Sequence, residues 1–331
     1  MQPVSYARAT DVAGAVAAVA GDPHSAYLAG GTTEVDLLRQ NVVHPRCLVD
    51  INELPLKQVE DLPDGGLRVG ALARMSDVAE APGVVERYPM LSQALLLGSS
   101  AQLRHMASIG GNLLQRVRCT YFRDPATPCN KREPGSGCSA LEGVNRGHAI
   151  LGTSERCIAT HPSDLAVALV ALDAVVHTER RGGGRAIPID DLFLLPGDTP
   201  DVEHPLEHGE LIVAVEVPAA PVARTSLYLK VRDRESYEFA LASVAAALRI
   251  ETGAIAEVRL ALGGVATKPW RARRAEDVLR GAPATRERFA RAAGAELEAA
   301  VPRRGNGYKV ELAQRAMLRA LEQAAALGGA A

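Results

Sequence analysis

Apolar and polar residues alternate along the first two thirds of the chain with two different periods. Three short apolar runs have the length of buried strands, and they occupy residues 26–30, 46–51 and 67–71. Three longer runs place apolar residues on one helical face, and they occupy residues 11–20, 33–40 and 163–174. The glycine-rich run at 180–185 separates two apolar runs and predicts a hairpin turn. Alternating strands and helices are typical of an α/β fold.

Prolines punctuate the chain at residues 217–224, directly after a strand-like apolar run. We expect a domain boundary there, near residue 222. Three long runs beyond it predict one antiparallel sheet, and they occupy residues 226–232, 239–250 and 256–264. Helices are expected over residues 273–301 and 309–327. The predicted domains are therefore 1–222 and 223–331.

Length and charge narrow the class of protein. A chain of 331 residues is long enough for two domains, each with its own core. A formal net charge of -2 gives no electrostatic reason to expect nucleic acid or a membrane surface as partner. Residues 12–20 are apolar like part of a signal peptide, but they follow Asp11 and lack a basic start. We expect an ordinary helix there, no export signal and no transmembrane segment.

Four of the five cysteines lie close together, at positions Cys119, Cys129, Cys138 and Cys157. Thiolates are the usual ligands of iron–sulfur clusters, and a [4Fe–4S] cluster takes four of them. The spacing matches neither ferredoxin runs nor zinc ribbons, so a cluster, a structural zinc, and disulfides or unrelated thiols all remain open. Cys47 lies in an apolar run and is expected to be a buried strand residue.

Basic residues surround these cysteines, namely Arg116, Arg118, Arg123, Lys131 and Arg132. Positive charge near a cluster would raise its reduction potential. The charges alone favour a simpler interpretation, which is a solvated basic surface.

Two glycine pairs are candidates for cofactor binding. The first is Gly30 and Gly31, where a strand turns directly into a helix, and the second is Gly110 and Gly111. Free amide hydrogens at such a turn can hold a pyrophosphate, with glycine allowing close approach. Each pair alone is more typical of a structural turn than of a ligand site, and neither forms the G-x-G-x-x-G dinucleotide motif.

Taken together, several segments closely resemble the FAD-binding medium subunit of the xanthine oxidase family of molybdenum hydroxylases. The segments are LAGGTTEV (28–35), ASIGGNLL (107–114), HPSDLAVALVALDA (161–174), FLLPGDT (193–199) and LKVRDRESYEFALASVAAAL (229–248). The resemblance spans almost the whole chain. The cysteine-bearing segment is similar to the subunits of this family that carry a [4Fe–4S] cluster, those of bacterial aldehyde oxidoreductase and of 4-hydroxybenzoyl-CoA reductase.

The resemblance implies a fold and a set of site residues. The fold is a two-lobed α/β FAD-binding domain of the PCMH type at 1–222, with a [4Fe–4S] insertion at about 116–157. A smaller α+β domain with a three-stranded antiparallel sheet and helices would follow at 223–331. The implied FAD-binding residues are Leu28, Ala29, Gly30, Gly31, Thr32, Thr33, Glu34, Val35, Ser108, Gly110, Gly111, Asn112, Asp164, Leu211, Ile212 and Lys230. The implied cluster ligands are Cys119, Cys129, Cys138 and Cys157.

Asp164 has an alternative role, and Lys230 has a specific one. Asp164 matches an acid near the FAD ribose or phosphates, but with Ser163 it could equally cap a helix. Lys230 matches a lysine near the flavin, where a cation would favour the anionic reduced ring. Ser236 and Tyr237 could also contact the isoalloxazine ring. No residue is expected to act as a general base, and the histidines are expected to be structural.

The resemblance also implies a function and partners. The chain would pass electrons from [2Fe–2S] clusters on a small partner subunit to FAD and on to an external acceptor. The substrate, by resemblance an aldehyde, would be oxidised at a molybdenum cofactor on a large partner subunit. The alternatives are a 4-hydroxybenzoyl-CoA reductase-like subunit, a stand-alone flavin oxidase and a zinc-stabilised binding module. Periplasmic residence by co-export with a signal-bearing partner is implied, with the cytoplasm as the alternative.

Overall fold

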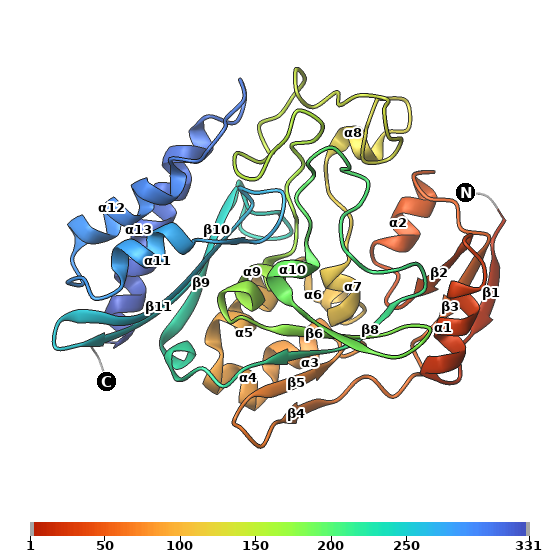
Figure 1. Ribbon diagram of the computed structural model, residues 1–331, viewed down its shortest axis with the longest axis horizontal. Helices are drawn as coiled ribbons and strands as arrows, with labels where there is room; N and C mark the ends of the chain where they lie inside the picture. Colours follow the sequence, from red (N-terminus) through yellow and green to blue (C-terminus); the bar gives the residue numbers. More distant parts are fainter. Residues whose placement is uncertain (1–2, 329–331) are drawn as a thin grey trace.

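A computed structural model describes residues 3–328 and contains three sheets arranged along the long axis of the molecule (Figure 1). The N-terminal sheet is parallel, because its strands are joined through helices that return the chain to the same edge. Its elements are β1 (Ser5–Arg8), α1 (Val12–Ala20), β2 (Ser25–Leu28), α2 (Glu34–Arg39) and β3 (Cys47–Asp50). The strand order is β1-β3-β2. The helix expected at 12–20 is thereby confirmed.

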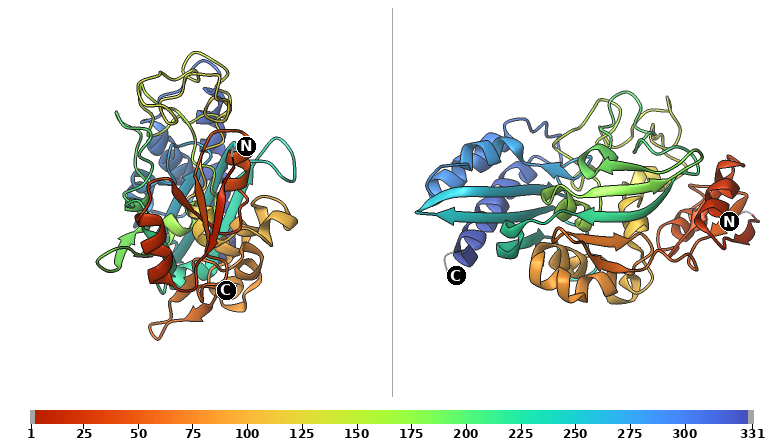
Figure 2. Two further views of the ribbon diagram at one scale, coloured as in Figure 1. Left: turned by 90° about the vertical axis from the view of Figure 1, so that its right-hand side faces the viewer. Right: turned by 60° about the horizontal axis from the view of Figure 1, so that its bottom comes forward.

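The central sheet has five strands in the order β4-β5-β8-β6-β7, all antiparallel. Its strands are β4 (Val59–Asp61), β5 (Leu67–Gly70), β6 (Val175–Glu179), β7 (Arg185–Pro188) and β8 (Leu211–Val217). The hairpin predicted at 180–185 joins β6 to β7. Helices α3 (Met75–Glu80), α4 (Pro82–Arg87) and α5 (Pro89–Leu97) cover one face of this sheet (Figure 2).

Four further helices lie between β5 and β8 along the chain. They are α6 (Ala101–Arg104), α7 (Ile109–Leu113), α9 (Asp164–Ala171) and α10 (Ile189–Leu192). Every residue of α9 is buried, because α5 packs on one side of it and the C-terminal sheet on the other. Apolar side chains around the whole helix are the pattern that such full burial requires.

The C-terminal sheet is antiparallel, in the order β12-β11-β10-β9. A 3-10 helix η1 (Pro221–Thr225) leads into β9 (Ser226–Val231), β10 (Ala242–Glu251), β11 (Ala254–Gly263) and β12 (Trp270–Arg271). The three long strands predicted from the sequence are observed, and the short β12 was not predicted. Helices α11 (Arg273–Leu279), α12 (Arg286–Leu297) and α13 (Tyr308–Gly328) pack against this sheet, with α13 lying along β10. The predicted helical stretch 273–301 is thus two helices, separated at Gly281 (φ 72°) and Pro283.

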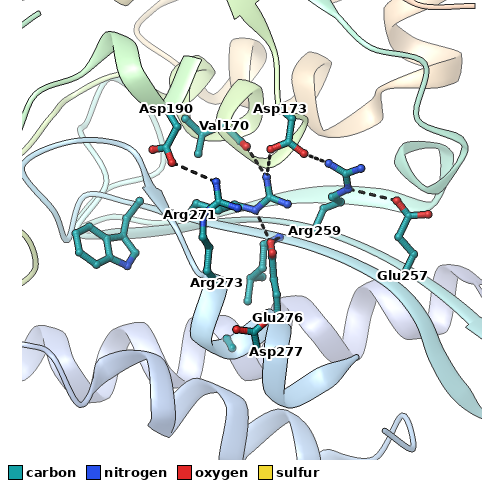
Figure 3. A network of polar contacts seen from close by, with 12 residues as sticks. Val170, Asp173, Asp190, Glu257, Arg259, Arg271, Arg273, Glu276 and Asp277 are labelled. Atoms are coloured by element: carbon teal, nitrogen blue, oxygen red, sulfur yellow. Dashed lines mark hydrogen bonds and ion pairs between the residues drawn. The ribbon is translucent and has the colours of Figure 1, made fainter. Parts of the chain in front are cut away.

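A charged network fastens the end of α9 to the C-terminal sheet (Figure 3). The Arg271 guanidinium pairs with Asp173 at 2.7 Å and with Glu276 at 2.5 Å, and it donates to the Val170 carbonyl at 2.9 Å. Arg259 of β11 pairs with the same Asp173. The Arg271 and Glu276 side chains are only 6% and 4% exposed, whereas Asp173, which joins them to the end of α9, is half exposed.

The cysteine-bearing segment between α7 and α9 has almost no regular structure, as its composition predicts. It contains α8 (Thr120–Arg123) and two isolated bridges, Cys129 to Cys138 and Leu151 to Ala266, and it lies at the top of Figure 1. Among residues 3–328, no helix combines the length and apolarity needed to cross a bilayer.

Candidate cofactor site

A groove of about 230 Å³ lies between the N-terminal sheet and the central sheet. Most of the residues expected to bind FAD line it, namely Ala29, Gly30, Gly31, Thr32, Thr33, Glu34, Ser108, Gly110, Gly111, Leu211 and Ile212. They come from the turn between β2 and α2, from the start of α7, and from the first residues of β8. Leu28, Val35, Asn112, Asp164 and Lys230 lie outside the lining.

The turn at residues 29–34 presents free backbone donors to this groove. In the described part of the chain, the N–H groups of residues 30–34 donate no hydrogen bond to another protein group. The turn is possible because Gly31 adopts φ 71°, a left-handed conformation that glycine tolerates best. Unpaired backbone N–H groups that face a cavity together form an anion-binding concavity.

Gly30 lets the two glycine-containing turns meet. A β-carbon at Gly30 would lie 2.0 Å from the carbonyl oxygen of Met106 and 3.1 Å from the α-carbon of Ala107. Both atoms belong to the backbone that leads into Ser108, so no side-chain movement could relieve the overlap. The two turns therefore form one wall only because position 30 has no side chain.

The second turn uses its backbone donors internally. The Gly110 N–H donates to the Ala71 carbonyl at 2.8 Å, and the Gly111 N–H donates to the Ser108 hydroxyl oxygen at 3.3 Å. The Ser163 hydroxyl donates to the Asn112 side-chain oxygen at 2.6 Å. The first turn thus offers backbone donors to the groove, whereas the second offers a rigid wall and the Ser108 hydroxyl.

Asp164 and Lys230 form a buried ion pair at 2.7 Å, and their side chains are 9% and 1% exposed. The Tyr228 hydroxyl donates to the other Asp164 oxygen at 2.7 Å, and the Lys230 ammonium also donates to the Leu97 carbonyl at 3.0 Å. Burial raises the pKa of Asp164, and the nearby Lys230 partly offsets this. The cap of α9 is Ser163, whose hydroxyl accepts from Ala166 N–H, so the Asp164 carboxylate remains available for the ion pair.

Three polar residues of the groove were not singled out from the sequence as cofactor ligands: Tyr27, Arg116 and Glu210. The Tyr27 hydroxyl donates to the Gly209 carbonyl at 2.7 Å and so connects β2 to the start of β8. Burial acts to raise the pKa of Glu210, but hydrogen bonds from Arg185, from Thr178 and from backbone outweigh it, and the pKa is lowered to about 2. Glu210 adjoins the predicted Leu211, which was the only signal for it in the sequence.

The four clustered cysteines line one small cavity together with Phe122 and Lys131. All five cysteines of the chain are free thiols, which argues against the disulfide alternative. Burial raises the pKa of Cys119 to about 12 and also raises the pKa of Cys157. Within residues 3–328, no three His, Cys, Asp or Glu side chains form a site for a metal ion. Ligation of a cluster or of zinc by these thiols therefore stays a prediction.

The interpretation of the surrounding basic residues as a solvated surface is wrong. Lys131 is buried and pairs with Glu203 at 3.1 Å, and Arg123 pairs with Asp36 of α2 at 2.5 Å. Burial lowers the pKa of Arg118 to about 10. These side chains are structural partners of acidic groups from other segments, because the cysteine segment folds down onto the groove.

The remaining predictions concern the histidines and the turn between β9 and β10. Burial lowers the pKa of both His148 and His161 to about 4, so both rings are neutral at physiological pH. The His148 ring nitrogen Nε2 lies 3.2 Å from the Cys119 sulfur. Tyr237 is 57% exposed and lies outside the groove lining, so contact with an isoalloxazine ring stays a prediction.

Known proteins resemble this chain in both sequence and fold. Residues 2–220 match the family described as FAD binding domain in molybdopterin dehydrogenase, and residues 227–324 match the CO dehydrogenase flavoprotein C-terminal domain. The chain is 46% identical to the Escherichia coli aldehyde oxidoreductase FAD-binding subunit PaoB, over 98% of this chain and 99% of PaoB. It is 28% identical to the glyceraldehyde dehydrogenase medium chain of Sulfolobus acidocaldarius, over 82% of this chain and 79% of that one.

The fold is also that of solved structures. A chain of carbon monoxide dehydrogenase from Hydrogenophaga pseudoflava superimposes with a TM-score of 0.76 at 24% identity, covering 98% of both chains. A chain of the Oligotropha carboxidovorans enzyme gives a TM-score of 0.77 at 21% identity, covering 98% of this chain and 99% of that one. This protein therefore belongs to the FAD-binding medium subunits of the xanthine oxidase family of molybdenum hydroxylases, and is an FAD-binding subunit of an oxidoreductase.

Proposed function

We propose that this chain is the electron-transfer subunit of a molybdenum-dependent aldehyde oxidoreductase, and that it carries FAD and a [4Fe–4S] cluster. The observation that carries the choice of aldehyde is the 46% identity to PaoB over nearly the full length of both chains. Relatives named for other substrates are more distant, such as the carbon monoxide dehydrogenase medium chain at 26%.

In this proposal the groove between the sheets holds FAD. The unpaired N–H groups of residues 30–34 bind the pyrophosphate, and the hydroxyls of Thr32, Thr33 and Ser108 add donors. Burial raises the pKa of Glu34, the acidic residue of this turn. Leu211 and Ile212 contribute the opposite wall. Bound FAD supplies the redox chemistry, while this chain positions it and limits its contact with water.

Leu28, Val35, Asn112, Asp164 and Lys230 complete the proposed FAD-binding set. Leu28 and Val35 support the first turn, since a β-carbon at Gly31 would meet both side chains. Asn112 ties the second turn to Ser163, next to the Asp164–Lys230 ion pair. We infer that the ion pair fixes the end of the groove nearest the C-terminal sheet. Because Asp164 balances the Lys230 charge, Lys230 would stabilise an anionic flavin less than a free lysine would.

We propose Cys119, Cys129, Cys138 and Cys157 as the cluster ligands. Support comes from the convergence of all four on one cavity that also contains Phe122 and Lys131. In a [4Fe–4S] cluster each thiolate binds a different iron, so the sulfurs stand farther apart than around a single ion. Buried thiols with raised pKa values keep their protons unless a metal replaces them. The Lys131 ammonium would compensate the negative charge of the loaded site, since its charge opposes the rise that burial causes in the pKa of Cys157.

The proposal includes partners and a compartment. A small subunit with two [2Fe–2S] clusters would deliver electrons, and a large subunit with the molybdenum cofactor would oxidise the aldehyde, in a heterotrimer or its dimer. The relatives named as medium chains support such an assembly. We also propose periplasmic residence by co-export on a signal-bearing partner, which cell fractionation of the tagged complex would test. Aldehyde-dependent flavin bleaching in the purified complex is expected, and its absence with all aldehydes would contradict the substrate class.

The cluster proposal is tested on the full chain purified without oxygen. We expect flavin absorption bands, a broad iron–sulfur absorption and about four irons per chain. Replacing Cys129 or Cys157 by serine should abolish the iron and leave FAD bound. Cys47→Ser is the matched control, because Cys47 lies in β3 away from the cysteine cavity and should keep the full iron content. Iron-free wild-type protein that still binds FAD would refute the cluster and leave the flavin assignment standing.

A further inference from the structure

One acidic residue, Glu203, connects the FAD groove to the cysteine cavity. It lies on the loop between α10 and β8, where its carbonyl accepts from the Leu194 N–H at 3.0 Å. One carboxylate oxygen pairs with the Arg116 guanidinium, and the other lies 3.1 Å from the Lys131 ammonium. Arg116 lines the groove, and Lys131 lines the cysteine cavity. A single side chain therefore contacts one wall residue of each site.

The two cations are held closely by the protein. Lys131 is 9% exposed, and its ammonium also donates to the Pro200 carbonyl at 2.7 Å. The Arg116 guanidinium lies 4.8 Å from the centre of the Phe122 ring, and Phe122 is itself part of the cysteine cavity. A cation over an aromatic face is an attractive arrangement. Arg116 is thus connected to the lining of the cysteine cavity twice, through Glu203 to Lys131 and directly through Phe122.

On the groove side, Arg116 influences the charge of the first turn. Burial raises the pKa of Glu34, and the Arg116 charge acts in the opposite direction. The position of Arg116 therefore determines how much positive charge the groove presents to a diphosphate. Because the segment at 116–157 has little regular structure, that position depends on what holds the segment in place.

We propose that Glu203 couples the two sites, so that filling the cysteine cavity increases the affinity of the groove for FAD. This inference rests on the proposed function, because it takes an iron–sulfur cluster as the occupant of the cavity. A loaded cavity fixes the positions of Phe122 and Lys131. These two residues in turn fix Glu203 and Arg116, so that Arg116 is already in place on the groove wall before FAD binds. Less ordering remains to be done when FAD binds, which is the origin of positive coupling.

The test measures the dissociation constant of FAD by equilibrium dialysis for iron-loaded and chelator-stripped full chain. For wild type we expect FAD to bind about fivefold or more tightly in the loaded form, the low end of ordinary coupling. In E203Q this ratio should fall close to one. Glu203→Asp keeps the charge but is too short to bridge both cations, so its ratio should also fall even if E203Q folds poorly.

Asp198→Asn provides the matched control. Asp198 pairs at 3.3 Å with Arg156, which lines the cysteine cavity, but neither residue lines the groove. This variant should keep the wild-type ratio, whereas a general loss of stability would weaken FAD binding equally in both iron states. The coupling alone would be overturned if loaded and stripped wild type bound FAD equally well. It would also be overturned if the Glu203 variants kept the wild-type ratio of the two dissociation constants. A wild-type chain that binds no iron would overturn both the coupling and the proposed cluster.

Discussion

Replacing Gly30 by alanine tests whether the two turns must touch to bind FAD. The added β-carbon would lie 2.0 Å from the Met106 carbonyl oxygen and 2.7 Å from its carbonyl carbon. Ordinary contact begins near 3.4 Å, so the turns must separate by more than 1 Å. Overpacking of this kind typically costs about 1–3 kcal/mol. No backbone strain is added, because Gly30 is not among the residues with positive φ.

That cost translates into a measurable change in FAD affinity. If the separation must be reversed when FAD binds, the dissociation constant should rise about 5- to 150-fold, the equivalent of about 1–3 kcal/mol. Equilibrium dialysis of stripped protein against FAD gives this constant, and urea unfolding of the same samples gives the stability. Gly294→Ala in α12 is the control, since a β-carbon there meets nothing within 4 Å. Wild-type FAD affinity in Gly30→Ala would refute the reasoning.

Three further predictions concern stability, each measured by urea unfolding. Lys230→Met leaves the Asp164 carboxylate buried without its ammonium partner and should lower the free energy of unfolding by about 3–5 kcal/mol. Adding Asp164→Leu should recover most of this loss. A double variant no more stable than the single one would argue against a buried charge as the cause. Arg271→Met removes the charged partner of the buried Glu276 in the network of Figure 3 and should lower the free energy of unfolding by about 3–5 kcal/mol. Arg280→Ala, in an exposed ion pair, should lower it by less than about 1 kcal/mol. Equal losses would contradict this ranking. The folded-state pKa of Glu210 is about 2, below its unfolded value of about 4.3, so its ionised form contributes stability above that value and the contribution is lost as pH falls toward 2. Wild type should therefore lose more stability than Glu210→Gln between pH 6 and pH 3, and parallel pH profiles would contradict the assignment.

Local features of the fold could be predicted because short-range sequence sets them. The hairpin at 180–185 follows from glycines between two apolar runs, and the helix at 12–20 follows from its period. Pairing between distant strands could not be predicted. Leu67 of β5 lies opposite Val217 of β8, a partner chosen by the packing of the whole core. The two-residue β12 is too short to show any period.

In the groove, too, the sequence predicted the local turns but not the contacts between distant residues. The glycine pairs predicted the turns that line it, because close backbone approach leaves glycine as a visible mark. Arg116 looked like a surface charge, since its partner Glu203 lies far along the chain and only folding brings them together. For the same reason the sequence could not show that Asp164 and Lys230 neutralise one another.

The three-stranded N-terminal sheet stands at one end of the molecule, and its small core also includes Leu211 and Val213 of β8 (Figure 2). Polar contacts join it to the rest at separate points, among them Tyr27 to Gly209, Arg123 to Asp36 at 2.5 Å and Arg74 to Asn52 at 2.9 Å. A flavin seated in the groove would touch both sides of this junction, so we expect it to act as a tether. In flavin-free protein this lobe should then be the first to open, exposing residues 52–58 to protease, and FAD at about 100 times its dissociation constant should protect it by about 2.7 kcal/mol.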